Sequence, residues 1–119
     1  HWNIEGPDFF ELHEEFENEY NTVKENIDIV AERIRVFGVK SNFTMKKTME
    51  LSKIKEQEKN LSALEMVREV MQDYEILHDS MLDGVNAALE TGDVVTENML
   101  TEFMTELEKR HWMFTSYLK

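Results

Sequence analysis

Four side chains in the first third of the chain are of types that bind transition metals. His1 and His13 bracket a Gly-Pro turn, and Asp28 and Glu32 lie further along what reads as one helix. Asp28 and Glu32 are four residues apart, so they share a helix face. Imidazole nitrogens together with carboxylate oxygens suit Fe(II) or Zn(II). A plainer interpretation stays open, in which the two carboxylates belong to a solvated acidic face beside two arginines.

Spacing limits how these side chains can meet. His13 and Asp28 are fifteen residues apart on one straight helix, which is roughly 22 Å, so they cannot bind one ion within a chain. Two copies of the helix lying antiparallel about a two-fold axis would bring His13 of one copy to Asp28 of the other. Such a dimer contains two equal sites. His13 and Glu17 also share a face, although a lone histidine at the edge of an apolar stripe is usually a hydrogen-bonded core residue.

A second pattern competes with this one. Glu75 and His78, and again Glu108 and His111, read Glu-x-x-His on two predicted helices. This motif supplies ligands in di-iron carboxylate bundles. The alternative function is therefore an intramolecular di-iron centre built from these four residues. Against it, both glutamates lie off the centres of the apolar stripes, and such spacings arise by chance in glutamate-rich helices.

Composition narrows the class of protein. The chain has 119 residues, 41% of them apolar, and a formal net charge of −12. The length indicates one domain, and no apolar run is long enough to span a membrane. The charge opposes binding to DNA and to anionic lipid. The absence of cysteine excludes disulfides and thiolate ligands and is compatible with a reducing cytosol, so we expect a cytoplasmic protein.

Apolar residues recur at steps of three and four, which predicts helices throughout, and no strand pattern competes. One proline and four glycines fit long, unbroken helices. The expected elements are three long helices and a short one, at residues 9–37, 44–52, 63–91 and 94–118. We expect a capping box at Asp8 and Glu11, a second at Ser62 and Glu65, and a cap from Asp93 or Thr96.

Helices this long more often belong to a four-helix bundle than to a three-helix one. We therefore predict an all-α, four-helix bundle whose first helix is missing from this chain. The chain starts with histidine rather than methionine, which indicates part of a longer protein. The short helix is expected between the second and third long helices of the bundle.

The segment "HWNIEGPDFFELHEEFENEY…DIVAERI" closely resembles the long-helix signature of the DNA-protection-during-starvation (Dps) family of mini-ferritins. The pattern is His-Trp, a turn containing glycine, Phe-x-x-Leu-His, a tyrosine, then Asp-x-x-Ala-Glu-Arg. "ETGDVVTENML" and "EKRHWMFTSYL" resemble the last turn and last helix of the family. The resemblance implies a ferritin-like four-helix bundle and a hollow shell of twelve subunits.

The resemblance also implies a ferroxidase centre between two subunits. His1 and His13 would come from one subunit, and Asp28 and Glu32 from its mate. Glu17 occupies a position where the family often has an acidic ligand, usually aspartate. The residues matching aromatic positions close to the centre are Trp2 and Tyr20. Those in the segment where cation pores form are Asp93 and Glu97, although they do not align cleanly with the family's pore carboxylates.

The implied activity is oxidation of Fe(II), preferably by hydrogen peroxide and otherwise by dioxygen, followed by storage of ferric iron and protection against oxidative damage. Zinc could substitute for iron. The last helix places His111 one position later than the family tends to, which weakens His111 as a ligand. The visible segment has no basic tail, so we expect no DNA binding. A helical structural module without chemistry remains the non-enzymatic alternative.

Overall fold

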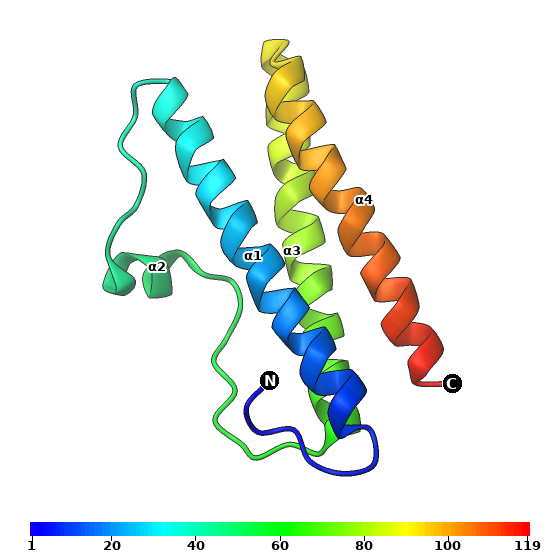
Figure 1. Cartoon of the computed structure of the whole chain (residues 1–119). Coiled ribbons are helices and arrows are strands. Elements are labelled where there is room, and N and C mark those ends of the chain that lie inside the picture. Colours follow the sequence, from blue (N-terminus) through cyan, green and yellow to red (C-terminus); the bar gives the residue numbers. More distant parts are fainter. The chain divides into compact units, whose positions relative to one another are not determined.

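The structure, a computed structural model, describes all of residues 1–119 and contains only helices: α1 (Phe9–Val36), α2 (Met45–Leu51), α3 (Ala63–Thr91) and α4 (Val94–Tyr117) (Figure 1). The all-α prediction is confirmed, and each helix end lies within one residue of the bound expected from periodicity. None of these helices combines the length and the apolar character that crossing a membrane requires. The chain divides into two compact units, His1–Ala63 and Leu64–Lys119, each described by itself.

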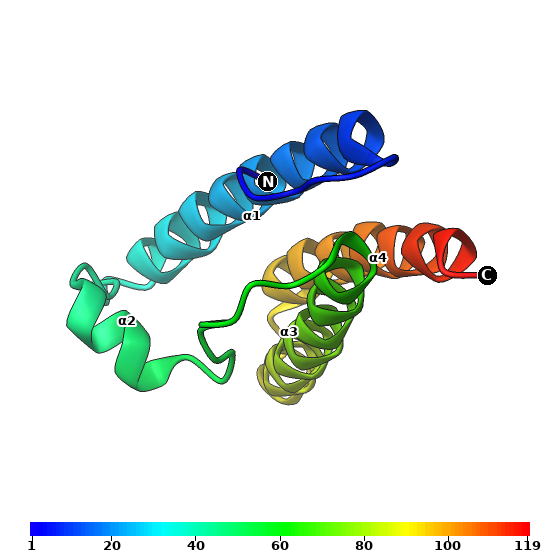
Figure 2. The ribbon, with the colours of Figure 1, turned by 90° about the horizontal axis from the view of Figure 1, so that it is seen from below.

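In the first unit the segment before α1 folds back along that helix, so that His1 lies beside it (Figure 2). The reversal occurs at Gly6 and Pro7, where the N–H of Phe9 donates to the carbonyl of Gly6 at 3.2 Å. The segment is anchored by Ile4, which is 2% exposed. The buried residues of α1 itself are Leu12 and Phe16, one turn apart. The fold-back therefore fixes His1 next to the second turn of α1.

The capping box expected at Asp8 and Glu11 is wrong. Asp8 is the N-cap residue of α1, but its side chain makes no capping hydrogen bond. Its φ of −92° and ψ of 17° lie outside the extended region from which an N-cap side chain reaches back to the first turn. The Gly-Pro turn imposes this backbone conformation. Asp8 joins the hydrogen bonds of the helix only through its carbonyl oxygen, which accepts the N–H of Leu12 at 3.0 Å.

The connection after α1 leaves the helix at Gly38, whose φ is +76°. The short helix α2 starts at a true cap, because the hydroxyl of Thr44 accepts the N–H of Lys47 at 3.2 Å. Met45 and Met49 on α2 are 86% and 50% exposed. The short helix thus leaves one methionine side chain largely exposed and the other half exposed.

In the second unit α3 and α4 form an antiparallel hairpin (Figure 1). Gly92, with φ of +71°, ends α3, and Asp93 N–H donates to the Ala88 carbonyl at 2.9 Å. This is the Schellman arrangement that a glycine after a helix allows. The helices approach closely at Gly84, where a Cβ would lie 2.7 Å from Cδ1 of Leu100. The buried side chains of this unit are Val67, Tyr74, Ala88 and Phe114.

Candidate metal centre

His1 and His13 hold each other in place. The Nδ1 atom of His1 lies 2.8 Å from the carbonyl oxygen of His13, and Nδ1 of His13 lies 3.0 Å from the carbonyl oxygen of His1. Their rings are stacked, with centroids 4.0 Å apart and planes 25° apart. The Gly-Pro turn makes this reciprocal arrangement, because it returns the chain to the helix twelve residues away.

These contacts determine the protonation of both rings. A carbonyl oxygen only accepts hydrogen bonds, so Nδ1 must carry the proton in each ring. In the neutral imidazole the lone pair is then on Nε2, which is the state a metal-binding histidine needs. A hydrogen bond from Nδ1–H to a backbone carbonyl is a common way in which proteins orient metal-binding histidines. Both histidines are therefore prepared to bind a cation through Nε2.

Two aromatic contacts support the pair. Phe9 stacks on the far side of His13 along the helix, with ring centroids 4.9 Å apart and planes 23° apart. Tyr20 meets His1 edge-on, with centroids 5.4 Å apart. Sequence reasoning missed Phe9; its spacing of four residues from His13, one helical turn, was the available signal.

Glu17 is linked to the pair through Tyr20. The Tyr20 hydroxyl donates to a carboxylate oxygen of Glu17 at 3.4 Å. Desolvation raises the pKa of Tyr20, and the charge of Glu17 and this hydrogen bond raise it further. Trp2, expected near the centre, is 89% exposed. The structure thus groups His1, His13, Tyr20 and Glu17 on one side of α1.

Asp28 and Glu32 are exposed on the same helix, further toward its end. Within one chain the structure does not bring them to the histidines. No group of three or more histidine, aspartate or glutamate side chains lies close enough together to hold a metal ion. One chain therefore holds the two imidazoles and the two carboxylates apart from each other.

The two acidic residues expected at a pore lie at the start of α4. Asp93 caps this helix: one carboxylate oxygen accepts the N–H of Thr96 at 3.0 Å, and the other accepts the Thr96 hydroxyl. Glu97 is in the first turn, where a negative charge interacts favourably with the helix dipole. Each residue thus has a local structural role.

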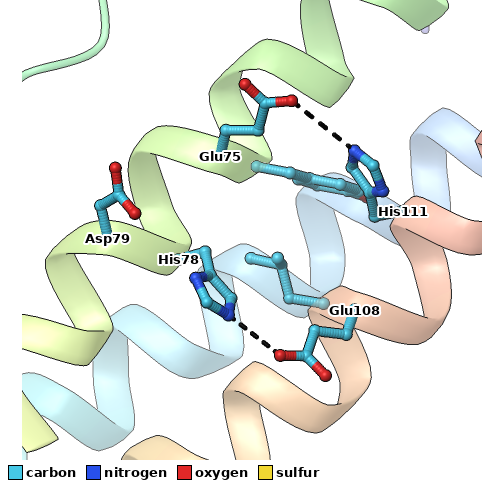
Figure 3. Close-up of a pocket in the computed structure, with 7 residues that line it drawn as sticks. Glu75, His78, Asp79, Glu108 and His111 are labelled. Carbon is cyan, nitrogen blue, oxygen red and sulfur yellow. Dashed lines mark hydrogen bonds and ion pairs between the residues drawn. The ribbon is translucent and has the colours of Figure 1, made fainter.

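The four residues of the Glu-x-x-His motifs face one another across α3 and α4 (Figure 3). Nε2 of His78 lies 3.0 Å from Oε1 of Glu108, and Nε2 of His111 lies 3.9 Å from Oε1 of Glu75. The histidine of each helix therefore pairs with the glutamate of the other. The hollow around them has a volume of about 280 Å³. Its remaining lining residues are Tyr74, Asp79 and Leu107.

The whole chain, residues 1–119, matches the model of the ferritin-like domain family. Among curated proteins it is 38% identical to general stress protein 20U of Bacillus subtilis and 40% identical to DNA protection during starvation protein 2 of Bacillus anthracis. Each alignment covers 99% of this chain and 81% of the relative.

Comparison with solved structures points to the same family. A Dps from Staphylococcus aureus superposes with a TM-score of 0.95 at 37% identity, covering 99% of this chain and 79% of that one. A Vibrio cholerae Dps, described as a member of a broad superfamily of ferritin-like diiron-carboxylate proteins, gives 0.94 at 31% identity, covering 99% and 74%. Zinc-soaked Listeria innocua Dps gives 0.94 at 30% identity, covering 98% and 80%. These similarities confirm the predicted ferritin-like fold.

Proposed function

The chain belongs to the Dps family of ferritin-like proteins, and from this premise we propose that it oxidises Fe(II) and stores the ferric product. We further propose that copies of the chain assemble into a hollow shell, a dodecamer in keeping with the family resemblance. Iron is the substrate and cargo, and zinc competes for the same ligands. Removal of Fe(II) together with peroxide protects the cell from oxidative damage.

Each proposed iron site lies between two copies of the chain. His1 and His13 of one copy supply nitrogens, and Asp28 and Glu32 of the second copy supply oxygens. Two antiparallel copies of α1 related by a two-fold axis bring these sets together twice, which gives two equal sites. Glu17 lies beside the histidines and is available as a further carboxylate. Exposed apolar residues on α2 are consistent with burial between copies.

The proposed ligands suit the reaction. Carboxylate oxygens stabilise Fe(III) more than Fe(II), because the added charge strengthens binding to hard oxygen donors. Two Fe(II) ions each give one electron, and one hydrogen peroxide takes both electrons and two protons to become two water molecules. The bond that breaks is O–O. Because both electrons are delivered at one site, no hydroxyl radical is released.

The observation that carries the proposal is the reciprocal bonding of His1 and His13, which leaves Nε2 of each ring available to a cation. An ordinary core histidine would use both ring nitrogens in hydrogen bonds within the chain. The solved relatives with TM-scores of 0.94 also include a Listeria innocua Dps variant with two histidines replaced by glycine, covering 98% of this chain and 78% of that one at 29% identity. The replaced histidines have the spacing of His1 and His13.

We propose that protection does not require DNA binding by residues 1–119. Their net charge of −12 repels the phosphate backbone. Cations, by contrast, are attracted to such a surface. Asp93 and Glu97 are proposed to draw Fe(II) toward the interior of the shell.

The proposal is tested by removing charge without changing side-chain size. In the double variant Asp28→Asn, Glu32→Gln, the initial rate of Fe(II) oxidation with peroxide should fall by more than the 10- to 100-fold that loss of an outer hydrogen-bond partner typically costs. Glu25→Gln, an exposed glutamate of the same helix, is the matched control and should oxidise Fe(II) at the parent rate. Light scattering checks that all three proteins assemble alike. An unchanged rate in an assembled double variant would overturn the proposal.

A further inference from the structure

The crossed pairs between α3 and α4 lie wholly within one chain and on different helices from the proposed interface site (Figure 3). We propose that Glu75, His78, Glu108 and His111 form a second site for divalent transition-metal ions. Each histidine–glutamate pair holds an ion through one nitrogen and one carboxylate oxygen, and water completes its coordination. This inference does not depend on the proposed function, since it needs no second copy.

The distances within the pairs match a shared ion. Metal–nitrogen bonds of about 2.0–2.1 Å and metal–oxygen bonds of about 2.0–2.2 Å place the two donor atoms about 3.0 Å apart at a right angle and about 3.4 Å apart at a tetrahedral angle. The observed separations of 3.0 Å and 3.9 Å lie on either side of the tetrahedral value. An ion can therefore enter either pair with only small side-chain rotations.

His111 provides a second, independent observation. Its Nε2 atom is buried and has no hydrogen-bond partner. The nearest carboxylate oxygen, on Glu75, lies at 3.9 Å, which is within reach of an ion pair but beyond a hydrogen bond. A buried nitrogen without a partner is costly, and a cation between His111 and Glu75 would satisfy it.

The exposure of the four side chains suits a metal site that is open to solvent. Glu75 and Glu108 are 72% and 64% exposed, so their carboxylates can meet a hydrated ion at the mouth of the hollow. The histidine side chains are 35% and 30% exposed and form its inner part. Because no three donors converge, each ion would keep several water ligands. Mixed nitrogen and oxygen donors select Fe(II), Co(II), Ni(II) or Zn(II) over Mg(II) and Ca(II).

Cobalt(II) is the probe, because its visible spectrum reports nitrogen and oxygen coordination. The protein that is titrated carries His1→Ala, His13→Ala, Asp28→Asn and Glu32→Gln, so that the proposed interface site does not contribute. We expect remaining Co(II) binding in this background. Adding His78→Gln and His111→Gln should weaken it at least tenfold and remove the bound-cobalt spectrum.

Asp79→Asn is the matched control, since Asp79 lines the same hollow but belongs to neither pair (Figure 3). The Asp79→Asn variant should bind Co(II) as tightly as the background protein that lacks this substitution. If the histidine variants unfold, as judged by circular dichroism, Glu75→Gln and Glu108→Gln replace them, because both change exposed side chains. Equal Co(II) binding with and without the four donors, or no binding in the background, would overturn the proposal. Either result leaves the test of the interface site unaffected.

Discussion

His1 and His13 are locked together by two reciprocal contacts, each ring nitrogen Nδ1 lying 2.8–3.0 Å from the other residue's carbonyl oxygen. The first of these residues lies in a loop and the second in α1, so the contacts also tie the fold-back to the helix. A ligand pair that is already oriented loses little conformational freedom when an ion binds.

Nitrogen-15 NMR should find both rings, when they are neutral, as the Nδ1–H tautomer. Zn(II) should then shift the Nε2 resonances of His1 and His13 while Nδ1 stays protonated, because the carbonyl bonds persist. The resonances of His78 and His111, which are proposed to bind Zn(II) as well, are told apart from those of His1 and His13 by substitution. Detection of Nε2–H in either His1 or His13 would contradict the geometry.

Phe9 is expected to act as a positioning residue through its stack on His13. Phe9→Leu keeps the apolar character but removes the ring, and an aromatic pair contributes about 0.5–1.5 kcal/mol. We expect Zn(II) affinity, measured by calorimetry, to fall about 2- to 10-fold, with KM for Fe(II) rising and kcat nearly constant.

The neighbouring residue provides the control for Phe9. Phe10 is 81% exposed and touches the Phe9 ring edge-on, with centroids 5.3 Å apart, so Phe10→Leu should leave Zn(II) affinity unchanged. A Phe9 variant that binds Zn(II) as tightly as the parent would show that Phe9 packs against His13 without positioning it for metal binding.

The helices could be predicted because their apolar residues recur at steps of three and four and because glycines mark the ends of α1 and α3. The Asp8 cap failed because a Gly-Pro turn sets the backbone there, which residue types alone do not reveal. The hydrogen bonds between His1 and His13 depend on how the loop returns to α1. The spacing of residue types along the sequence could not predict them. For Asp28, the spacing along the sequence did exclude a metal site shared with His13 within one chain, since one straight helix cannot bring the two residues together.

Asp73 should make stability depend on pH. Burial raises the pKa of its carboxyl above the ordinary 3.8, and Glu69, one turn earlier, raises it further. The folded protein therefore holds this proton more tightly than the unfolded chain does, so its stability falls as pH rises from about 3.8 through the raised pKa. Above that pKa the charged carboxylate is a net cost.

Asp73→Asn should therefore stabilise the protein at pH 7 by about 0.2–0.5 kcal/mol, the usual cost of like charges one turn apart. The gain should vanish when the pH drops below 3.8, and thermal unfolding at several pH values measures it. A gain that persists in acid would contradict the assignment.

Asp93 allows the capping and electrostatic roles of one carboxylate to be separated. Asparagine caps helices as well as aspartate does, so Asp93→Asn should keep the bond to the Thr96 N–H and leave the melting temperature unchanged. Asp93→Ala removes the cap and should cost about 0.5–2 kcal/mol. Stopped-flow oxidation should show slower Fe(II) entry in both variants. Parent-like entry in Asp93→Asn would exclude Asp93 from the cation path.

The central claim, that each iron site combines ligands from two copies, is tested by mixing two inactive proteins. One carries His1→Ala and His13→Ala, and the other carries Asp28→Asn and Glu32→Gln. In a dimer of the two, one site has lost all its ligands and the other has every ligand intact. With random pairing, half the dimers are mixed, so about a quarter of the parent sites should return.

The measurement is the initial rate of Fe(II) oxidation after the two variants are dissociated, mixed and reassembled. Each variant reassembled alone is the control and should stay inactive. We predict that the mixture recovers about a quarter of the parent rate. A mixture that reassembles fully and stays as inactive as its components would contradict the account.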